Sequence, residues 1–369
     1  MSKVAQTVLE IDLHALDHNY HFLRSKLKAS TKFMAVVKAA GYGSDCVTIA
    51  KRLASLQVDY FAVAYTHEGV MLREAGIQLP ILVLHPQAVN FETLIAHKLE
   101  PSLYSPRIFS AFIKVARETK VEAYPVHIKF NTGLNRLGFW ENDIEYIASQ
   151  LENSALLKIK GIFSHLAASD DLKEREFTYT QIAAFKKIVS SMEAVLGYRP
   201  MKHVLNTSGI INYSESQWDM VRSGIGLYGY GNDPTIDTEL KQVASLKTII
   251  SQIHKIEPEE SVGYNRAYIS KDFRTTATLP LGHADGIGRQ YGNGKAFVIV
   301  KGQKAPIIGN VCMDMLMVDI TGIDCKEGDE VIVFGKGQTA EEFARYANTI
   351  SYELLTGIAS RVKRVFIDS

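Results

Sequence analysis

Short apolar runs alternate with segments of helical periodicity along roughly the first 230 residues of the chain. The run at 33–37 is valine-rich and too short for a helix core, which predicts a strand buried on both faces of a parallel sheet. Roughly eight strand–helix alternations in about 200–250 residues favour a parallel (β/α)₈ TIM-type barrel over the alternative, an open doubly wound sheet. The other strands are expected at 60–64, 81–84, 102–104, 126–130, 159–163, 203–205 and 220–221, and the helices at 14–27, 44–56, 66–75, 106–119, 142–151 and 172–196.

The pattern changes after the loop at 229–234. Most later segments are β-rich and separated by Gly and Asp turns, and only 340–346 and 352–358 have helical spacing. We therefore predict an α/β barrel domain over 1–234 and a mostly β C-terminal domain over 235–369. The weakly alternating stretch at 7–13 is expected to be a strand, either in the first domain or packed on the second.

Composition narrows the class of protein. The 41 basic and 40 acidic residues leave a net charge of +1 and form no long runs, so nothing favours nucleic acid or an anionic membrane as a partner. No apolar stretch approaches membrane-spanning length, and the N-terminus lacks the layout of a signal peptide. The three cysteines form no C-x-x-C pair, which is typical of a reduced compartment. The chain is expected to be a soluble cytoplasmic protein.

Polar or charged residues directly follow the predicted barrel strands. Lys38 stands at the end of the run at 33–37, beside a Gly41-Tyr42-Gly43 turn, and is either a snorkelling end-cap or a reactive amine. Function in a barrel lies just beyond the carboxyl ends of the strands, and several candidates at equivalent positions are harder to dismiss than one. The candidates are Lys38, Lys129, Arg136, His165, Asn206 and Arg222.

The ends of the last two predicted strands suggest a phosphate site. Residues 206–209 (Asn-Thr-Ser-Gly) and 223–225 (Ser-Gly-Ile) offer backbone N–H groups, hydroxyls and a helix start, where barrels commonly bind phosphate. Residues 224–229 also match the dinucleotide fingerprint G-x-G-x-x-G, but a loop and a β domain follow instead of a helix, which argues against that function. The histidines show no metal-ligand spacing, so no metal is expected.

Three unusual runs mark the second domain. They are a turn at 261–266 with Tyr264, a polar kink at 309–315 with Met313, and a helix start at 349–353 with Tyr352. Each tyrosine could equally be an aromatic residue at the edge of the core.

Taken together, these runs resemble alanine racemase, the fold-type-III enzyme that uses pyridoxal 5′-phosphate (PLP). Ala35-Val36-Val37-Lys38-Ala39 with Gly41-Tyr42-Gly43 is similar to the family's cofactor-lysine signature. The resemblance covers essentially the whole chain and keeps the order of the motifs. Further matching blocks lie at 126–139, 163–165, 222–225, 262–264, 284–286, 313–314 and 349–353.

The resemblance implies a catalytic role for two residues. Lys38 would hold PLP as a Schiff base and act as one base, and Tyr264 of the second subunit of a homodimer would be the base on the opposite face. Arg136 and the backbone at Met313 would receive the carboxylate of the substrate, alanine. The implied product, D-alanine, would supply cell-wall peptidoglycan.

The resemblance also implies the cofactor contacts. Arg222 would face the pyridine nitrogen, with His165 behind the ring, and Arg136 would face the phenolic oxygen. Lys129 stands where some members carry a carbamylated lysine that fixes the arginine. The remaining cofactor-binding residues, most of them at the phosphate, would be Tyr42, Asn206, Thr207, Gly224, Ile225 and Tyr352.

Several positions depart from the commonest family pattern without removing a catalytic group. Three of the departures (His283, Asn265 and Asn310) leave the shape of the substrate entrance, and hence the substrate range, open. The others are Ala40, Ser44, Asn131 and Ser223, in place of Asn, His, Asp and Pro.

Racemisation needs a base on each face of Cα, which one lysine and one tyrosine can supply. An arginine opposite the ring nitrogen keeps its proton, so the ring stays a weak electron sink and side reactions such as transamination are disfavoured. The alternatives are a racemase of broader range, for example on serine, a decarboxylase of the same fold, and a non-catalytic PLP-binding protein. Arg222 argues against the decarboxylase, and residues 235–369 argue against the non-catalytic protein.

Overall fold

The computed structural model describes residues 5–152, 155–231 and 234–368. Its internal contacts divide the chain into two units. The barrel unit comprises 17–41 and the described part of 46–241, and the β unit comprises the described parts of 1–16, 42–45 and 242–369. Asn232 and Asp233, in the loop where the sequence pattern changes, lie outside the described residues.

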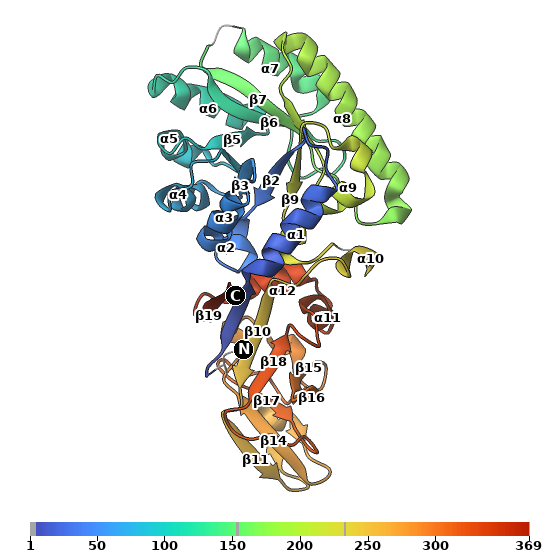
Figure 1. The fold of residues 1–369 in the computed structure, drawn as a ribbon. Helices are drawn as coiled ribbons and strands as arrows, with labels where there is room; N and C mark the ends of the chain where they lie inside the picture. The colour runs from blue at the N-terminus through green and yellow to red at the C-terminus, as the bar shows by residue number, and fades with distance from the viewer. Residues whose placement is uncertain (1–4, 153–154, 232–233, 369) are drawn as a thin grey trace. The chain divides into compact units, whose positions relative to one another are not determined.

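The barrel unit is built on one sheet of eight parallel strands, in the order β8-β7-β6-β5-β4-β3-β2-β9 (Figure 1). Hydrogen bonds from Asp219 N to Lys202 O (3.2 Å) and from Arg222 N to Leu205 O (3.0 Å) join the two ends of the sheet. The predicted barrel is therefore confirmed. Its strands are β2 (Lys32–Val36), β3 (Tyr60–Val63), β4 (Ile81–Val83), β5 (Glu100–Leu103), β6 (Tyr124–Lys129), β7 (Leu157–Phe163), β8 (Met201–His203) and β9 (Met220–Ser223).

Helices cover the outside of the barrel sheet (Figure 1). The strands they cover carry almost continuous apolar sequence, since a parallel sheet in a barrel is buried on both faces. Helix α6 shows the local rules well: Ser105 caps it by accepting from Ile108 N, and Pro106 stands in its first turn, where a missing N–H costs nothing. The helices are α1 (Leu13–Ser25), α3 (Cys46–Ser55), α4 (Thr66–Glu74), α5 (Phe91–Ala96), α6 (Pro106–Glu118), α7 (Ile144–Leu151), α8 (Arg175–Leu196), α9 (Thr207–Asn212) and α10 (Pro234–Asp237).

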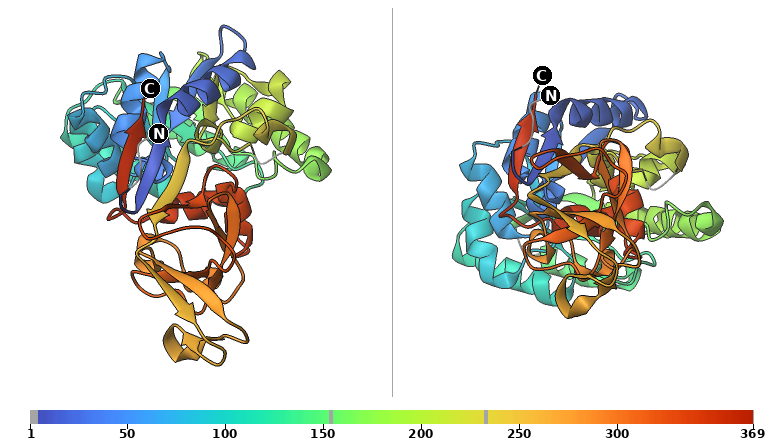
Figure 2. Two further views of the ribbon diagram at one scale, coloured as in Figure 1. Left: turned by 60° about the horizontal axis from the view of Figure 1, so that its bottom comes forward. Right: turned by 90° about the horizontal axis from the view of Figure 1, so that it is seen from below.

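The β unit is organised around a nine-stranded sheet in the order β11-β14-β17-β16-β15-β18-β10-β1-β19. The two ends of the chain meet in it, because β1 pairs in parallel with β19 and antiparallel with β10 (Figure 2). The sequence alone does not decide whether this first strand packs on the second domain, and the pairing of β1 with β10 and β19 places it there. The elements are β1 (Val8–Asp12), β10 (Ala244–Ile249), β11 (Gln252–Ile256), β12 (Ser261–Val262), β13 (Tyr268–Ile269), β14 (Arg274–Leu279), β15 (Phe297–Val300), β16 (Gln303–Ile308), β17 (Leu316–Asp319), β18 (Glu330–Phe334), β19 (Lys363–Ile367), α11 (Ala340–Arg345) and α12 (Ser351–Gly357).

Some predicted elements were wrong in detail. The strand expected at 220–221 extends to Ser223, so Arg222 lies inside β9 rather than after it. The strand expected at 203–205 is β8, which ends at His203, and Asn206 is the N-cap of α9. Helix α5 and strand β19 were not predicted. Strand β19 (Lys-Arg-Val-Phe-Ile) begins with two charged residues, which leaves only a short apolar run, and α5 is only six residues long.

Among the described residues, no helix is both long enough and apolar enough to cross a membrane.

Candidate active site

Lys38 is presented by an unusual turn at the carboxyl end of β2. The next three residues, Ala39, Ala40 and Gly41, have φ of +53°, +53° and +63°, which is the left-handed region that L-residues avoid. The buried carboxylate of Glu68 fastens this turn, since it accepts hydrogen bonds from the backbone N–H of Ala39 (2.7 Å) and of Ala64 (2.6 Å). The lysine is thereby held on the rim of the barrel by a contact that is independent of its own side chain.

Arg136 is carried by the loop that follows β6. The loop is closed at its base by hydrogen bonds between Phe139 N and Lys129 O (2.8 Å) and between Asn131 N and Phe139 O (2.9 Å). Inside it, the side chain of Asn131 accepts from the backbone N–H of Asn135 (2.9 Å) and donates to the Asn135 side chain (2.8 Å). The amide at position 131 therefore orders the segment that carries Arg136, even though the commonest family pattern has aspartate there.

Arg222 is buried at the centre of the barrel unit. Its Nη1 donates to His203 Nδ1 (2.7 Å) and His203 O (3.0 Å), and its Nη2 donates to Ser164 O (2.7 Å), Val204 O (3.2 Å) and His165 Nδ1 (3.3 Å). Burial lowers the pKa of Arg222 to about 9, so the guanidinium remains a cation at neutral pH. No described residue accepts a hydrogen bond from Nε, which leaves that donor for a ligand.

Positive charge dominates the electrostatics of this end of the barrel. Burial, together with the charges of Arg136, Arg222 and Lys38, lowers the pKa of Lys129 to about 8. The same four cations, together with burial, hold the pKa of His165 well below its ordinary value, so this imidazole is neutral. The pKa of Lys38 is also lowered, first by burial and then by Arg136, while Glu68 opposes the shift. The structure thus brings together five predicted site residues: Lys38, Lys129, Arg136, His165 and Arg222.

The predicted phosphate-binding segments lie side by side at the ends of β8 and β9. Thr207 Oγ1 lies 3.0 Å from Ser223 Oγ and accepts from the backbone N–H of Gly224 (3.4 Å) and Gly226 (3.3 Å). A Cβ at Gly226 would stand 2.5 Å from Thr207 Cγ2, so only glycine fits there. Ile225 begins a short 3₁₀ turn (Ile225–Tyr228) that ends in a left-handed glycine. A dinucleotide site would need a helix to begin in this segment, but the next helix among the described residues, α10, begins at Pro234.

The remaining predicted residues belong to the β unit. Tyr42 and Tyr352 are neighbours, with ring centroids 6.2 Å apart. Tyr264 is 71% exposed, and with Met313 it lines a pocket of about 500 Å³. The Asn310 side chain holds the turn at Tyr264, because its amide donates to the Tyr264 carbonyl oxygen (3.1 Å).

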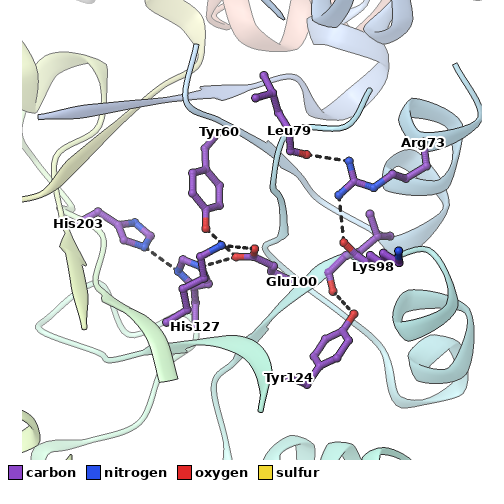
Figure 3. Close-up of polar contacts among 10 residues, drawn as sticks. Tyr60, Arg73, Leu79, Lys98, Glu100, Tyr124, His127 and His203 are labelled. Atoms are coloured by element: carbon purple, nitrogen blue, oxygen red, sulfur yellow. Dashed lines mark hydrogen bonds and ion pairs between the residues drawn. The ribbon is translucent and has the colours of Figure 1, made fainter. Parts of the chain in front are cut away.

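Sequence reasoning missed three buried polar residues beneath Arg222, namely Glu100, His127 and His203. They form the chain of contacts drawn in Figure 3. A signal for His127 was present: it stands two residues before Lys129 in a strand, and residues two apart on a strand share a face. A polar residue two positions from a predicted site residue on the same strand therefore indicates a second side chain inside the barrel.

Comparison with known proteins decides the family. The model of the alanine racemase N-terminal domain matches residues 11–232, and that of the alanine racemase C-terminal domain matches residues 243–366. This chain belongs to the alanine racemase family. The alanine racemases of Thermodesulfovibrio yellowstonii and Halothermothrix orenii are 38% and 35% identical to it, covering 100% and 98% of this chain and 99% and 96% of theirs.

Solved structures agree with this assignment. The alanine racemase of Clostridium difficile 630 has a TM-score of 0.91 at 35% identity and covers 100% of this chain and 97% of its own. The alanine racemase of Bartonella henselae, solved with covalently bound pyridoxal phosphate, has a TM-score of 0.90 at 30% identity, covering 99% of this chain and 100% of its own. The predicted enzyme class, a PLP-dependent amino-acid racemase of the alanine racemase family, and the predicted cofactor are therefore confirmed.

Proposed function

We propose that this member of the alanine racemase family interconverts L- and D-alanine by a two-base mechanism, in a cytoplasmic homodimer, and that the D-alanine serves peptidoglycan synthesis. Lys38 is one base, and Tyr264 of the partner subunit is the other. The observation that carries the proposal is the cluster of cations around Lys38 at the carboxyl end of the barrel, in which Lys129 and Arg222 are buried.

The cluster fits the cofactor and the substrate. Every charge among the described residues that acts on Lys129 and His165 is positive, and like charges this close repel one another. A phosphate, a phenolate oxygen and a substrate carboxylate are the anions that PLP and alanine would bring. Arg136 would hold the phenolate and the carboxylate, assisted by the backbone of Met313, and the phosphate would lie beside Asn206, Thr207, Gly224, Ile225, Tyr42 and Tyr352.

Lys38 has the properties that a Schiff-base lysine and a proton carrier need. A lysine must lose its proton to act as a nucleophile or base, and burial beside Arg136 lowers its pKa in that direction. PLP, when bound, supplies the acidity of the substrate Cα–H. The proton that Lys38 removes from one face would be replaced on the other face from the Tyr264 hydroxyl.

Arg222 would direct the chemistry towards racemisation. Its Nη1 and Nη2 are occupied by the barrel, and Nε–H is left to donate to the pyridine nitrogen. Because the guanidinium is still a cation at neutral pH, it will not transfer its proton to the ring. The lowered pKa of Lys129 favours the neutral amine that carbamylation requires, which supports the proposed modification of this residue beside Arg136.

The direct test is a racemisation assay. Purified enzyme loaded with PLP is given L-alanine, and the formation of D-alanine is followed by chiral chromatography beside a panel that includes serine. Alanine is expected to be the best substrate. Racemisation of serine at a comparable rate would support the broader racemase, for which the exposed His283 is the relevant departure, and release of CO₂ without racemisation would overturn the proposal.

Arg222→Glu is expected to lower racemisation by about 10²-fold and to raise transamination, measured as pyruvate formed from alanine. Glutamate can share a proton with the ring nitrogen, which makes the ring a stronger electron sink. Arg222→Gln is the matched control, because it also loses the hydrogen bonds that Arg222 donates to the carbonyls of His203 and Ser164 but supplies no acid. Equal pyruvate formation by the two variants would contradict the proposed role of Arg222.

A further inference from the structure

A continuous line of buried polar side chains runs from Arg222 towards the opposite end of the barrel. His203 Nε2 lies 3.1 Å from His127 Nδ1, and His127 Nε2 lies 2.9 Å from Glu100 Oε2 (Figure 3). Glu100 is the first residue of β5, and its other oxygen accepts from Lys160 (2.6 Å), whose side chain is 33% exposed. The line therefore connects the candidate active site with the surface near the N-terminal ends of the strands.

The two ends of this line fix the direction of every hydrogen bond in it. Arginine has only donors, so His203 Nδ1 must accept and the proton of this neutral imidazole must be on Nε2. His203 then donates to His127 Nδ1, which places the His127 proton on Nε2, where it donates to Glu100. Burial opposes ionisation of Glu100, but hydrogen bonds from His127 and Lys160 outweigh it and hold the pKa of the carboxyl below its ordinary value. An ionised carboxylate has only acceptors, so both ends impose the same order.

Burying this line of polar side chains requires special features of the barrel and costs desolvation free energy. A carboxylate, two imidazoles and a guanidinium are all buried, although burying each ion costs several kcal/mol before pairing. Strands β6 and β7 shift register at Val126 and His127. Across from them, a Cβ at Gly161 would lie 2.2 Å from His127 Nδ1, so a side chain there would displace the ring. An apolar layer would fill a barrel core without these requirements.

We propose that Glu100 and His127 are positioning residues that hold the Arg222 guanidinium through His203. The imidazole of His203 stacks on Phe163 (4.8 Å between centroids, 5° between planes), and the Arg222 guanidinium carbon lies 5.3 Å from the centroid of the same ring. His203 can therefore neither tilt nor reverse while His127 occupies its Nε2. Its Nδ1 lone pair stays directed at Nη1, and the guanidinium keeps the orientation in which no described residue accepts from Nε. The inference rests on the proposed function of Arg222.

The first test needs neither cofactor nor turnover. Nitrogen-15 NMR of histidine-labelled apoenzyme should show the proton of His127 and of His203 on Nε2, each signal assigned by replacement of its histidine. A proton on Nδ1 of either ring would overturn the proposal. This result does not depend on whether the enzyme racemises alanine. It therefore separates failure of the proposed role of Glu100 and His127 from failure of the proposed function.

The second test compares Glu100→Gln with Tyr60→Phe. Both remove a polar contact at the same carboxylate, since the Tyr60 hydroxyl donates to Glu100 Oε2 (2.9 Å), but only the first weakens the acceptor of the imidazole chain. In the apoenzyme, Glu100→Gln should speed solvent exchange of the His203 Nε2 proton about tenfold. In the holoenzyme it should lower kcat about tenfold with KM for alanine unchanged. Tyr60→Phe should change either quantity less than about threefold.

If Glu100→Gln does not fold, Glu100→Gln/Lys160→Met replaces it, because the double variant leaves no unpaired lysine at Glu100. A structural role alone would lower the melting temperature in both variants and leave proton exchange at His203 alike in the two. Equal exchange rates and equal kcat in Glu100→Gln and Tyr60→Phe would overturn the proposal.

Discussion

Lys38→Ala is expected to leave a folded protein that no longer holds PLP covalently and racemises alanine at least about 10²–10⁴-fold more slowly. The turn beyond the lysine is fixed by Glu68 and the backbone, so removal of the amine should not disturb the barrel. The measurements are circular dichroism for the fold, borohydride reduction followed by mass spectrometry for the lysine adduct, and the chiral assay for activity.

Lys32→Ala is the matched control. Lys32 begins the same strand, β2, but is exposed at its other end, so its loss should change neither the adduct nor the activity. A borohydride-trapped adduct formed at normal yield by Lys38→Ala would show that another residue holds the cofactor.

Mixed dimers should recover activity that neither parent variant possesses. Lys38→Ala and Tyr264→Phe homodimers are each expected to be nearly inactive, because every site in them lacks one base. Co-refolding the two in equal amounts should give about half mixed dimers, each with one intact and one doubly defective site, and hence about a quarter of the parent activity. Activity is measured on the unfractionated mixture and again on mixed dimers isolated through two different affinity tags, which should have about half of the parent activity.

The control for the mixed-dimer experiment is a pair of differently tagged Lys38→Ala chains, which should recover nothing. If Tyr264 served its own chain, no mixed dimer of Lys38→Ala and Tyr264→Phe could contain an intact site. Purified mixed dimers without activity would therefore refute the shared site.

The sequence predicted the barrel well because its signals are local. An apolar run such as 33–37 followed by a charged residue marks both a strand and the rim position after it, and Lys38 was found in this way. The same signal misplaces Arg222, because it ends a strand at the first charged residue, whereas Arg222 lies inside β9. In a barrel interior, a strand can continue through a charged residue when a polar side chain on another strand hydrogen-bonds to it, as His203 does to Arg222.

The line of buried polar side chains behind Arg222 was not predicted, because its residues are separated in sequence. Glu100, His127 and His203 come from three strands, and each alone looks like a polar residue at a strand end or a satisfied core histidine. Only the folded sheet, in which β5 lies beside β6 and one strand separates β6 from β8, brings them within hydrogen-bond distance. Similarly, nothing in the sequence shows that Glu68, thirty positions after Lys38, anchors the turn at Ala39.

The left-handed turn after Lys38 makes this stretch a target for stabilisation. Ala39 and Ala40 are exposed alanines in a conformation that costs an L-residue about 1–2 kcal/mol. Asparagine tolerates it better and is the usual family residue at position 40, so Ala40→Asn should raise the free energy of unfolding by about 1 kcal/mol. Chemical denaturation of the apoenzyme, with Ala75→Asn at a right-handed helix end as the control, would measure the gain. An engineer seeking a more heat-resistant racemase could thus begin two residues from the proposed catalytic lysine, at a side chain with no proposed role in catalysis.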